Sequence, residues 1–79
     1  MTPPPPAYPG QPVGGPFKPG MLVWLYQLDG TPRLARPVRI LAVRRWGDQV
    51  DVQWRPAPEA VPRWHNAQFV VAMSGEAQP

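Results

Sequence analysis

The side chains that can take part in chemistry in this sequence are mainly arginines and tryptophans, and they suit binding better than catalysis. Seven of the 79 residues are arginine and four are tryptophan, whereas histidine and serine occur once each and cysteine is absent. Guanidinium groups hold carboxylates and phosphates through paired hydrogen bonds, and flat aromatic rings stack on bases or on other side chains. These residue types favour a protein that recognises a partner.

Groups for conventional catalysis are scarce. His65 is the single histidine, and Ser74 lies near the carboxyl end. The acids fall at turns or opposite Arg44, where a solvated role is the simpler interpretation, and neither a catalytic triad nor a carboxylate pair can be assembled. Without cysteine there is no disulfide and no thiolate metal site. We therefore expect a non-catalytic protein with no cofactor and no metal.

Composition divides the chain into three parts. Residues 1–18 are rich in proline and glycine, residues 19–73 contain the apolar runs, and residues 74–79 are polar. We call residues 1–18 the leader. It offers too little apolar surface to offset the entropy of ordering it, so we expect it to be disordered, and we expect residues 74–79 to be frayed. Residues 19–73 form the predicted domain.

The leader contains the stretch Pro5-Pro6-Ala7-Tyr8, which matches the short proline–tyrosine ligand of WW domains. In a segment so dense in proline we interpret the match as a coincidence. The chain shows neither the basic start and apolar stretch of a secretory signal nor a run long enough to span a bilayer. We expect a cytoplasmic protein of bacterial or phage origin that does not bind membranes.

The clearest structural signal is a β-hairpin around Gly47-Asp48. A two-residue turn there places Trp46 opposite Gln49 and makes the numbers of paired residues sum to 95. Because side chains alternate across a strand, Leu41, Val43, Val50, Val52 and Trp54 should share the buried face. Ala42, Arg44, Asp51, Gln53 and Arg55 should share the solvent face, with Arg44 paired to Asp51 across the strands.

Further strands are expected on either side of this hairpin. Residues 21–26 read as a strand with Met21, Val23 and Leu25 on one face. Residues 28–37 read as a long loop, and the prolines of residues 56–62 limit any strand near 60–64 to a short edge strand. One turn of tight helix is expected within residues 64–68, followed by a strand at 69–73.

This order of elements resembles the small SH3-like β-barrels, including the Tudor, KOW and retroviral integrase C-terminal variants. In that group a Pro-Gly-x-x-Val sequence commonly opens the first strand, and here it reads Pro19-Gly20-Met21-Leu22-Val23. The resemblance covers residues 19–73 and implies an all-β, five-stranded SH3-like barrel. It implies little about function, because this fold carries many unrelated activities.

The plasmid-borne type II dihydrofolate reductases are similar in length, in their disordered leader and in their SH3-like barrel. Their Val-Gln-Ile-Tyr motif, in the strand before the last helical turn, corresponds here to Val61-Pro62-Arg63-Trp64. The valine is kept and an aromatic residue replaces the tyrosine, but Pro62 has no side-chain donor with which to bind ligand amides. NADPH-dependent reductase activity in an oligomer is therefore the second alternative function.

The leading expectation is a non-catalytic module that binds a protein partner or self-associates, since so small a core is often supported by a partner subunit. The first alternative is binding of RNA or single-stranded nucleic acid, which fits a net charge of +3 and a pI near 10.2. The candidate binding residues are the exposed arginines and the aromatic residues least obviously required in the core: Arg39, Arg45, Arg55, Arg63, Trp24, Tyr26, Trp46 and Trp64.

Overall fold

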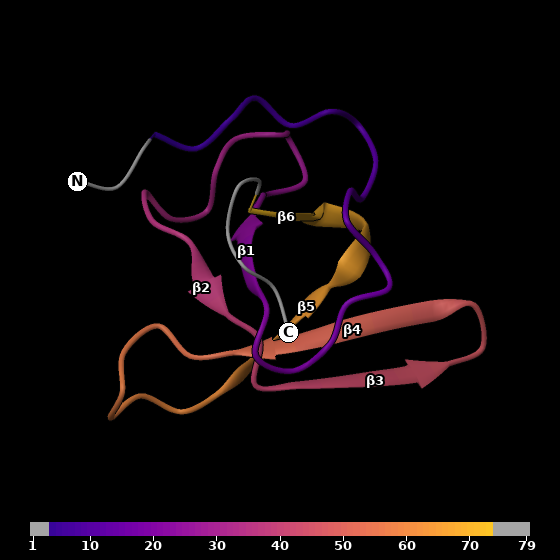
Figure 1. Ribbon diagram of the computed structural model, residues 1–79, viewed down its shortest axis with the longest axis vertical. Helices are drawn as coiled ribbons and strands as arrows, with labels where there is room; N and C mark the ends of the chain where they lie inside the picture. Colours follow the sequence, from indigo (N-terminus) through magenta and orange to yellow (C-terminus); the bar gives the residue numbers. More distant parts are fainter. Residues whose placement is uncertain (1–3, 74–79) are drawn as a thin grey trace.

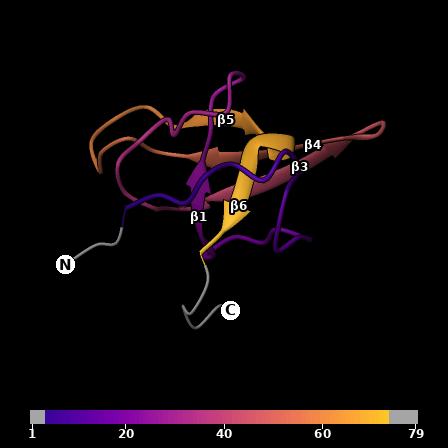
Figure 2. The same cartoon turned by 90° about the horizontal axis from the view of Figure 1, so that it is seen from above.

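The computed structural model describes residues 4–73, and it confirms the predicted all-β class. Two small antiparallel sheets have the strand orders β2-β1-β6 and β3-β4-β5. The first contains β1 (Leu22–Leu25), β2 (Val38–Arg39) and β6 (Val70–Ala72). The second contains β3 (Ala42–Trp46), β4 (Gln49–Trp54) and β5 (Arg63–Asn66). In Figure 1 the β3–β4 hairpin extends to one side of the other strands, and Figure 2 shows β1 and β6 crossing the direction of β3 and β4.

The β3–β4 hairpin has the predicted register. Trp46 pairs with Gln49, Arg44 with Asp51, and Val43 with Val52. Gly47 in the turn has φ of +63°, the left-handed region that a two-residue hairpin turn requires and that glycine adopts without steric cost. A local turn and strict alternation are together enough to specify this element.

The main core lies between the two sheets and is made of ten buried residues: Phe17, Met21, Val23, Leu25, Val38, Ile40, Val52, Trp54, Ala67 and Val70. Val52 and Trp54 are buried as predicted, and Val43 and Val50 pack partly buried against the same core. The prediction for Leu41 is wrong, because this side chain is 41 % exposed. Its neighbour Ile40 takes the core position, since the backbone N–H of Ile40 bonds to the carbonyl of Met21 and the regular alternation of β3 begins only at Ala42.

The end of the chain differs from the prediction by a few residues. Trp64 and His65 belong to β5, so the tight helical turn η1 covers Ala67–Phe69 and begins three residues later than the predicted range. The side chain of Asn66 caps this turn by accepting a hydrogen bond from the N–H of Gln68 at 2.9 Å. The last strand, β6, falls within the predicted residues 69–73. The predicted frayed tail at 74–79 lies outside the described residues.

The leader contacts the first sheet through Pro6, Tyr8 and Val13, in contrast to the disorder expected for it; residues 1–3 lie outside the described residues. Figure 1 shows the leader arching over the strands before it descends beside β6. Val13 forms a parallel bridge with Val71, and the N–H of Ala72 bonds to the carbonyl of Val13 at 2.8 Å. Phe17 is 8 % exposed and belongs to the main core. The packed region therefore begins before the predicted boundary at residue 19.

Candidate aromatic and arginine binding face

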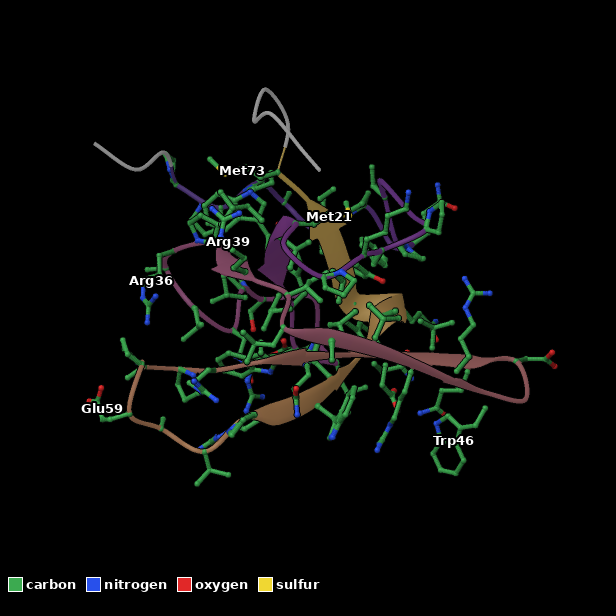
Figure 3. All side chains as sticks on the ribbon, turned by 60° about the horizontal axis from the view of Figure 1, so that its bottom comes forward. Met21, Arg36, Arg39, Trp46, Glu59 and Met73 are labelled. Carbon is green, nitrogen blue, oxygen red and sulfur yellow. The ribbon has the colours of Figure 1, made fainter. Side chains whose placement is uncertain are left out.

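The outer surface of the β3-β4-β5 sheet presents two tryptophans with an arginine between them. The guanidinium carbon of Arg44 lies 4.2 Å from the ring centroid of Trp64 and 5.6 Å from that of Trp46, both within cation–π range. Trp46 is 63 % exposed and Trp64 is 39 % exposed. In Figure 3 Trp46 lies near the hairpin turn, on the side of the β3–β4 ribbon away from the other sheet.

A buried carboxylate holds this arrangement together. Asp51 is 4 % exposed and accepts hydrogen bonds from Nε of Arg44 at 3.1 Å, Nε1 of Trp46 at 3.2 Å and Nε2 of Gln49 at 3.0 Å. The hydrogen bond from Gln49, followed by those from Trp46 and Arg44, lowers the pKa of Asp51, although burial opposes this shift. Asp51 therefore stays ionised and fixes the side chains around it.

We call Arg44, Trp46, Asp51 and Trp64 the tryptophan face. Sequence reasoning placed Asp51 on a solvated surface, which is wrong, because the Trp46 and Gln49 side chains cover it. The sequence predicted the pairing of Arg44 with Asp51, and the structure places Arg44 at the centre of the face, between the two indole rings. The signal available in the sequence was the register itself, which puts Trp46 beside Gln49 at the end of the hairpin and Asp51 on the same surface.

The predicted site arginines do not join this face. Arg45 pairs with Val50 and so lies on the opposite side of the sheet from Arg44. There it lines a groove of about 930 Å³ between the hairpin and the leader, together with residues such as Pro12 and Phe17. Arg63 pairs with Trp54, which also puts it on the opposite side from Trp64, and it is exposed.

Arg39 and Arg55 meet at a different part of the molecule. With Arg36 they line a groove of about 290 Å³, and Figure 3 shows Arg36 and Arg39 at the opposite end of the molecule from Trp46. Each of the three guanidinium groups donates a hydrogen bond to a backbone carbonyl. Arg36 donates to Pro56, Arg39 to Gly20 and Arg55 to Pro58. These contacts fix the side chains on the protein's own backbone.

Trp24 and Tyr26 were predicted to be exposed, and this prediction is wrong. Trp24 is 3 % exposed and Tyr26 is fully buried. They lie on the outer face of β1, away from the main core, and pack with Val71 beneath the leader. Sequence reasoning assigned no cover to this face because the leader was expected to be disordered.

His65 links the two sheets. Its Nε2 lies 2.9 Å from the carbonyl oxygen of Tyr26, where the neutral ring donates a hydrogen bond. Burial lowers the pKa of His65, and the hydrogen bond to Tyr26 opposes this shift. His65 lines a groove of about 510 Å³ with Tyr26, Arg33 and Trp64. Its position is that of a structural residue.

Neither a metal cluster nor a membrane-spanning helix is found in the described part. Among residues 4–73, no three His, Cys, Asp or Glu side chains gather closely enough to hold a metal ion. Within the same residues, no helix has the length and apolarity needed to cross a bilayer. The residues that correspond to the reductase motif are split, because Val61 is 80 % exposed in the loop before β5 and only Arg63 and Trp64 belong to that strand.

Comparisons with protein-family models, with curated proteins and with solved structures found no match to this chain.

Proposed function

We propose that this chain is a non-catalytic interaction module that binds a protein partner through the tryptophan face, in the simplest case a second copy of itself. The observation that carries the proposal is the exposure of Trp46 and Trp64 on either side of Arg44. Tryptophan and arginine are the residues most enriched among those that dominate the binding energy of protein interfaces. Two exposed indole rings on one small sheet therefore mark a surface suited to a partner.

The rigidity of the face also supports this function. Binding normally costs about 0.5–1.5 kcal/mol for each flexible side chain that becomes fixed at an interface. Here Asp51 already holds Arg44 and Trp46 by hydrogen bonds, and the stack with Trp64 restrains Arg44 further. Less side-chain entropy remains to be lost when a partner binds.

We propose that the two sheets are the halves of an SH3-like barrel. β2 and β3 are separated only by Ile40 and Leu41, so they can be counted as one bent strand, and the six strands then become the five of the expected fold. The N–H of Leu41 bonds to the carbonyl of Gln53 at 2.8 Å, which continues the pairing through the bend. A tight helical turn before the last strand also fits the expected order.

The second candidate is binding of single-stranded nucleic acid by the same face. The specific observation in its favour is the stack of Arg44 on the two indoles, because single-stranded bases bind on aromatic rings and guanidinium planes. The net charge of +3 would assist the approach of a polyanion. Against it, Arg39, Arg45 and Arg55 lie away from the face, so few phosphates would be neutralised beside the stacked bases.

Light scattering on the full chain, over a wide concentration range, tests the proposal. We expect the mass to rise with concentration in the wild type and in Val61→Ala, which removes an exposed apolar residue outside the face. Trp46→Ala and Trp64→Ala should hold the mass at that of a monomer. Equal self-association by all four proteins would show that the face is not the interface.

Two further results complete the test. If the wild type stays monomeric, an affinity capture with the same four proteins as baits asks whether a foreign partner is retained in a way that depends on Trp46 and Trp64. Capture that is identical for all baits, or absent, rejects the protein-binding proposal. A titration followed by tryptophan fluorescence decides the alternative: no change up to about 100 μM of a mixed oligonucleotide, the weak end of non-specific affinity, rejects nucleic-acid binding.

A further inference from the structure

The first sheet carries an aromatic surface that is covered by a segment of the chain itself. Trp24, Tyr26 and Val71 form a cluster on the outside of β1 and β6, with Phe69 packed against it. We call these four residues the aromatic cluster. Trp24, Tyr26 and Val71 are at most 7 % exposed, although they face away from the main core. Tyr8 of the leader packs against them from the outside, together with Met73.

The leader contacts the aromatic cluster through its Pro-Pro-Ala-Tyr stretch. The ring of Tyr8 lies 5.1 Å from that of Tyr26 and 5.8 Å from that of Phe69, and its hydroxyl donates to the carbonyl of Gln68 at 2.5 Å. The hydroxyl of Tyr26 donates to the carbonyl of Pro6 at 2.5 Å. A proline-rich segment makes no internal backbone hydrogen bonds, so its carbonyls are free to accept bonds of this kind.

The leader then passes close to the edge of the first sheet. Val13 bridges Val71, and Gly14 follows with φ of +89°. A Cβ atom at Gly14 would overlap the Cβ of Ala72, so only glycine fits between the leader and β6. The sequence thus provides both a ligand stretch and the clearance that lets it reach the sheet.

We propose that the aromatic cluster is a docking site for a Pro-Pro-x-Tyr segment, occupied by the chain's own leader and able to accept the leader of a second copy. The contacts have the chemistry of proline-rich recognition: aromatic rings receive the tyrosine, and a phenolic hydroxyl binds a proline carbonyl. The match to a proline–tyrosine ligand in the leader is then a functional feature, and its receptor lies in the same chain.

Tethering explains why the leader occupies its own site. A short flexible linker gives a tethered segment an effective concentration of the order of 1 mM. For an intrinsic Kd of about 100 μM, the cluster would be filled about ten times more often than empty, and a free peptide would bind with an affinity reduced by about tenfold. Weakening the tethered leader should remove this competition.

The experiment uses the full chain and a fluorescent peptide of residues 4–12, with binding followed by anisotropy. Tyr8→Ala removes the ring that stacks on Tyr26 and Phe69, so we expect the peptide to bind this variant about tenfold more tightly than it binds the wild type. A peptide in which Tyr8 is replaced by alanine should lose this affinity. Trp46→Ala, on the other sheet, should bind the peptide as the wild type does.

A matched pair of glycine variants checks the geometry. Gly14→Ala forces the leader away from Ala72 and should raise peptide affinity, whereas Gly10→Ala has a similarly positive φ but nothing within 4 Å of the added Cβ, and should raise it less. If Tyr8→Ala does not fold, as judged by thermal melting, Tyr8→Phe removes only the bond to Gln68 and should give a smaller gain of the same sign.

Equal peptide affinity in the wild type, Tyr8→Ala and Gly14→Ala would overturn the docking site, as would equal binding of the two peptides. This result is separable from failure of the proposed function. The tryptophan face is tested by Trp46→Ala and Trp64→Ala, which leave the aromatic cluster intact.

Discussion

The two sheets of this small protein are covered in different ways. In β2-β1-β6 both sides of β1 are buried, one by the main core and the other by the leader. In β3-β4-β5 the inner side packs on the main core, and the outer side carries the exposed Trp46 and Trp64. The first sheet is therefore packed on both sides, by the leader and by the main core, whereas the second sheet is packed against the core on one side only.

This difference shows that the chain covers the outer face of one sheet and leaves that of the other exposed. Two packed sheets create one interior, and each leaves an outer face to be covered or exposed. The leader crosses one outer face and supplies apolar contacts there. On the other, hydrogen bonds from Arg44, Trp46 and Gln49 to Asp51 keep large side chains fixed without burying them. The uncovered face is the one that we propose as the binding surface.

The largest effect should come from the tryptophan that belongs to the shared core. Trp54 is 2 % exposed, so Trp54→Ala should lower the free energy of unfolding by about 3–5 kcal/mol. Trp46→Ala on the outer face should lower it by a smaller amount, about 1.5 kcal/mol, because Trp46 is exposed and the variant loses one hydrogen bond to the Asp51 carboxylate. Urea denaturation of the two variants measures both values. Similar losses would show that the core side and the outer side of this sheet do not differ in burial in solution.

Asp51→Asn should have the next largest effect, because it removes the charge that anchors the tryptophan face. We expect a loss of about 1.5–3 kcal/mol, the range for hydrogen bonds to a charged group. Asp48→Asn, in the exposed hairpin turn, serves as the control. Near-wild-type stability of Asp51→Asn would mean that the face is held by stacking alone.

The same carboxylate makes stability depend on acid. The pKa of Asp51 is lower in the folded state than in the unfolded chain, so its contribution is present above about pH 4 and is lost as pH falls through the folded value. Asp51→Asn should therefore lose less stability than the wild type over this acid range. Thermal melts of the two proteins at a series of pH values measure the difference.

The smallest effect concerns the leader on the first sheet. Tyr26→Phe removes one hydrogen bond, to the carbonyl of Pro6, and keeps the ring in place. The free energy of unfolding should fall by about 0.5–1.5 kcal/mol, the usual value of a single hydrogen bond. The amide of Ala72, which bonds to Val13, should also exchange faster. An unchanged exchange rate at Ala72 would show that the bond to Pro6 does not hold the leader on the sheet.

The sequence was sufficient where structure depends on neighbours along the chain. The Gly47-Asp48 turn and the alternation on either side of it determine the hairpin register, and with it the burial of Val52 and Trp54. The same register already placed Arg44, Trp46 and Asp51 on one surface. These features are set by backbone geometry, since a shift of one residue would reverse every side chain.

Only the tertiary structure decided the burial of β1 on both sides and the separation of the arginines. Whether Trp24 and Tyr26 are exposed depends on where Tyr8, sixteen or more residues earlier in the chain, packs, and the composition of the leader alone argued for disorder. Arg39 and Arg55 meet because the bend at Ile40 brings the end of β2 near the end of β4. Contacts between distant segments depend on the loop paths that join them, and local residue patterns do not specify those paths.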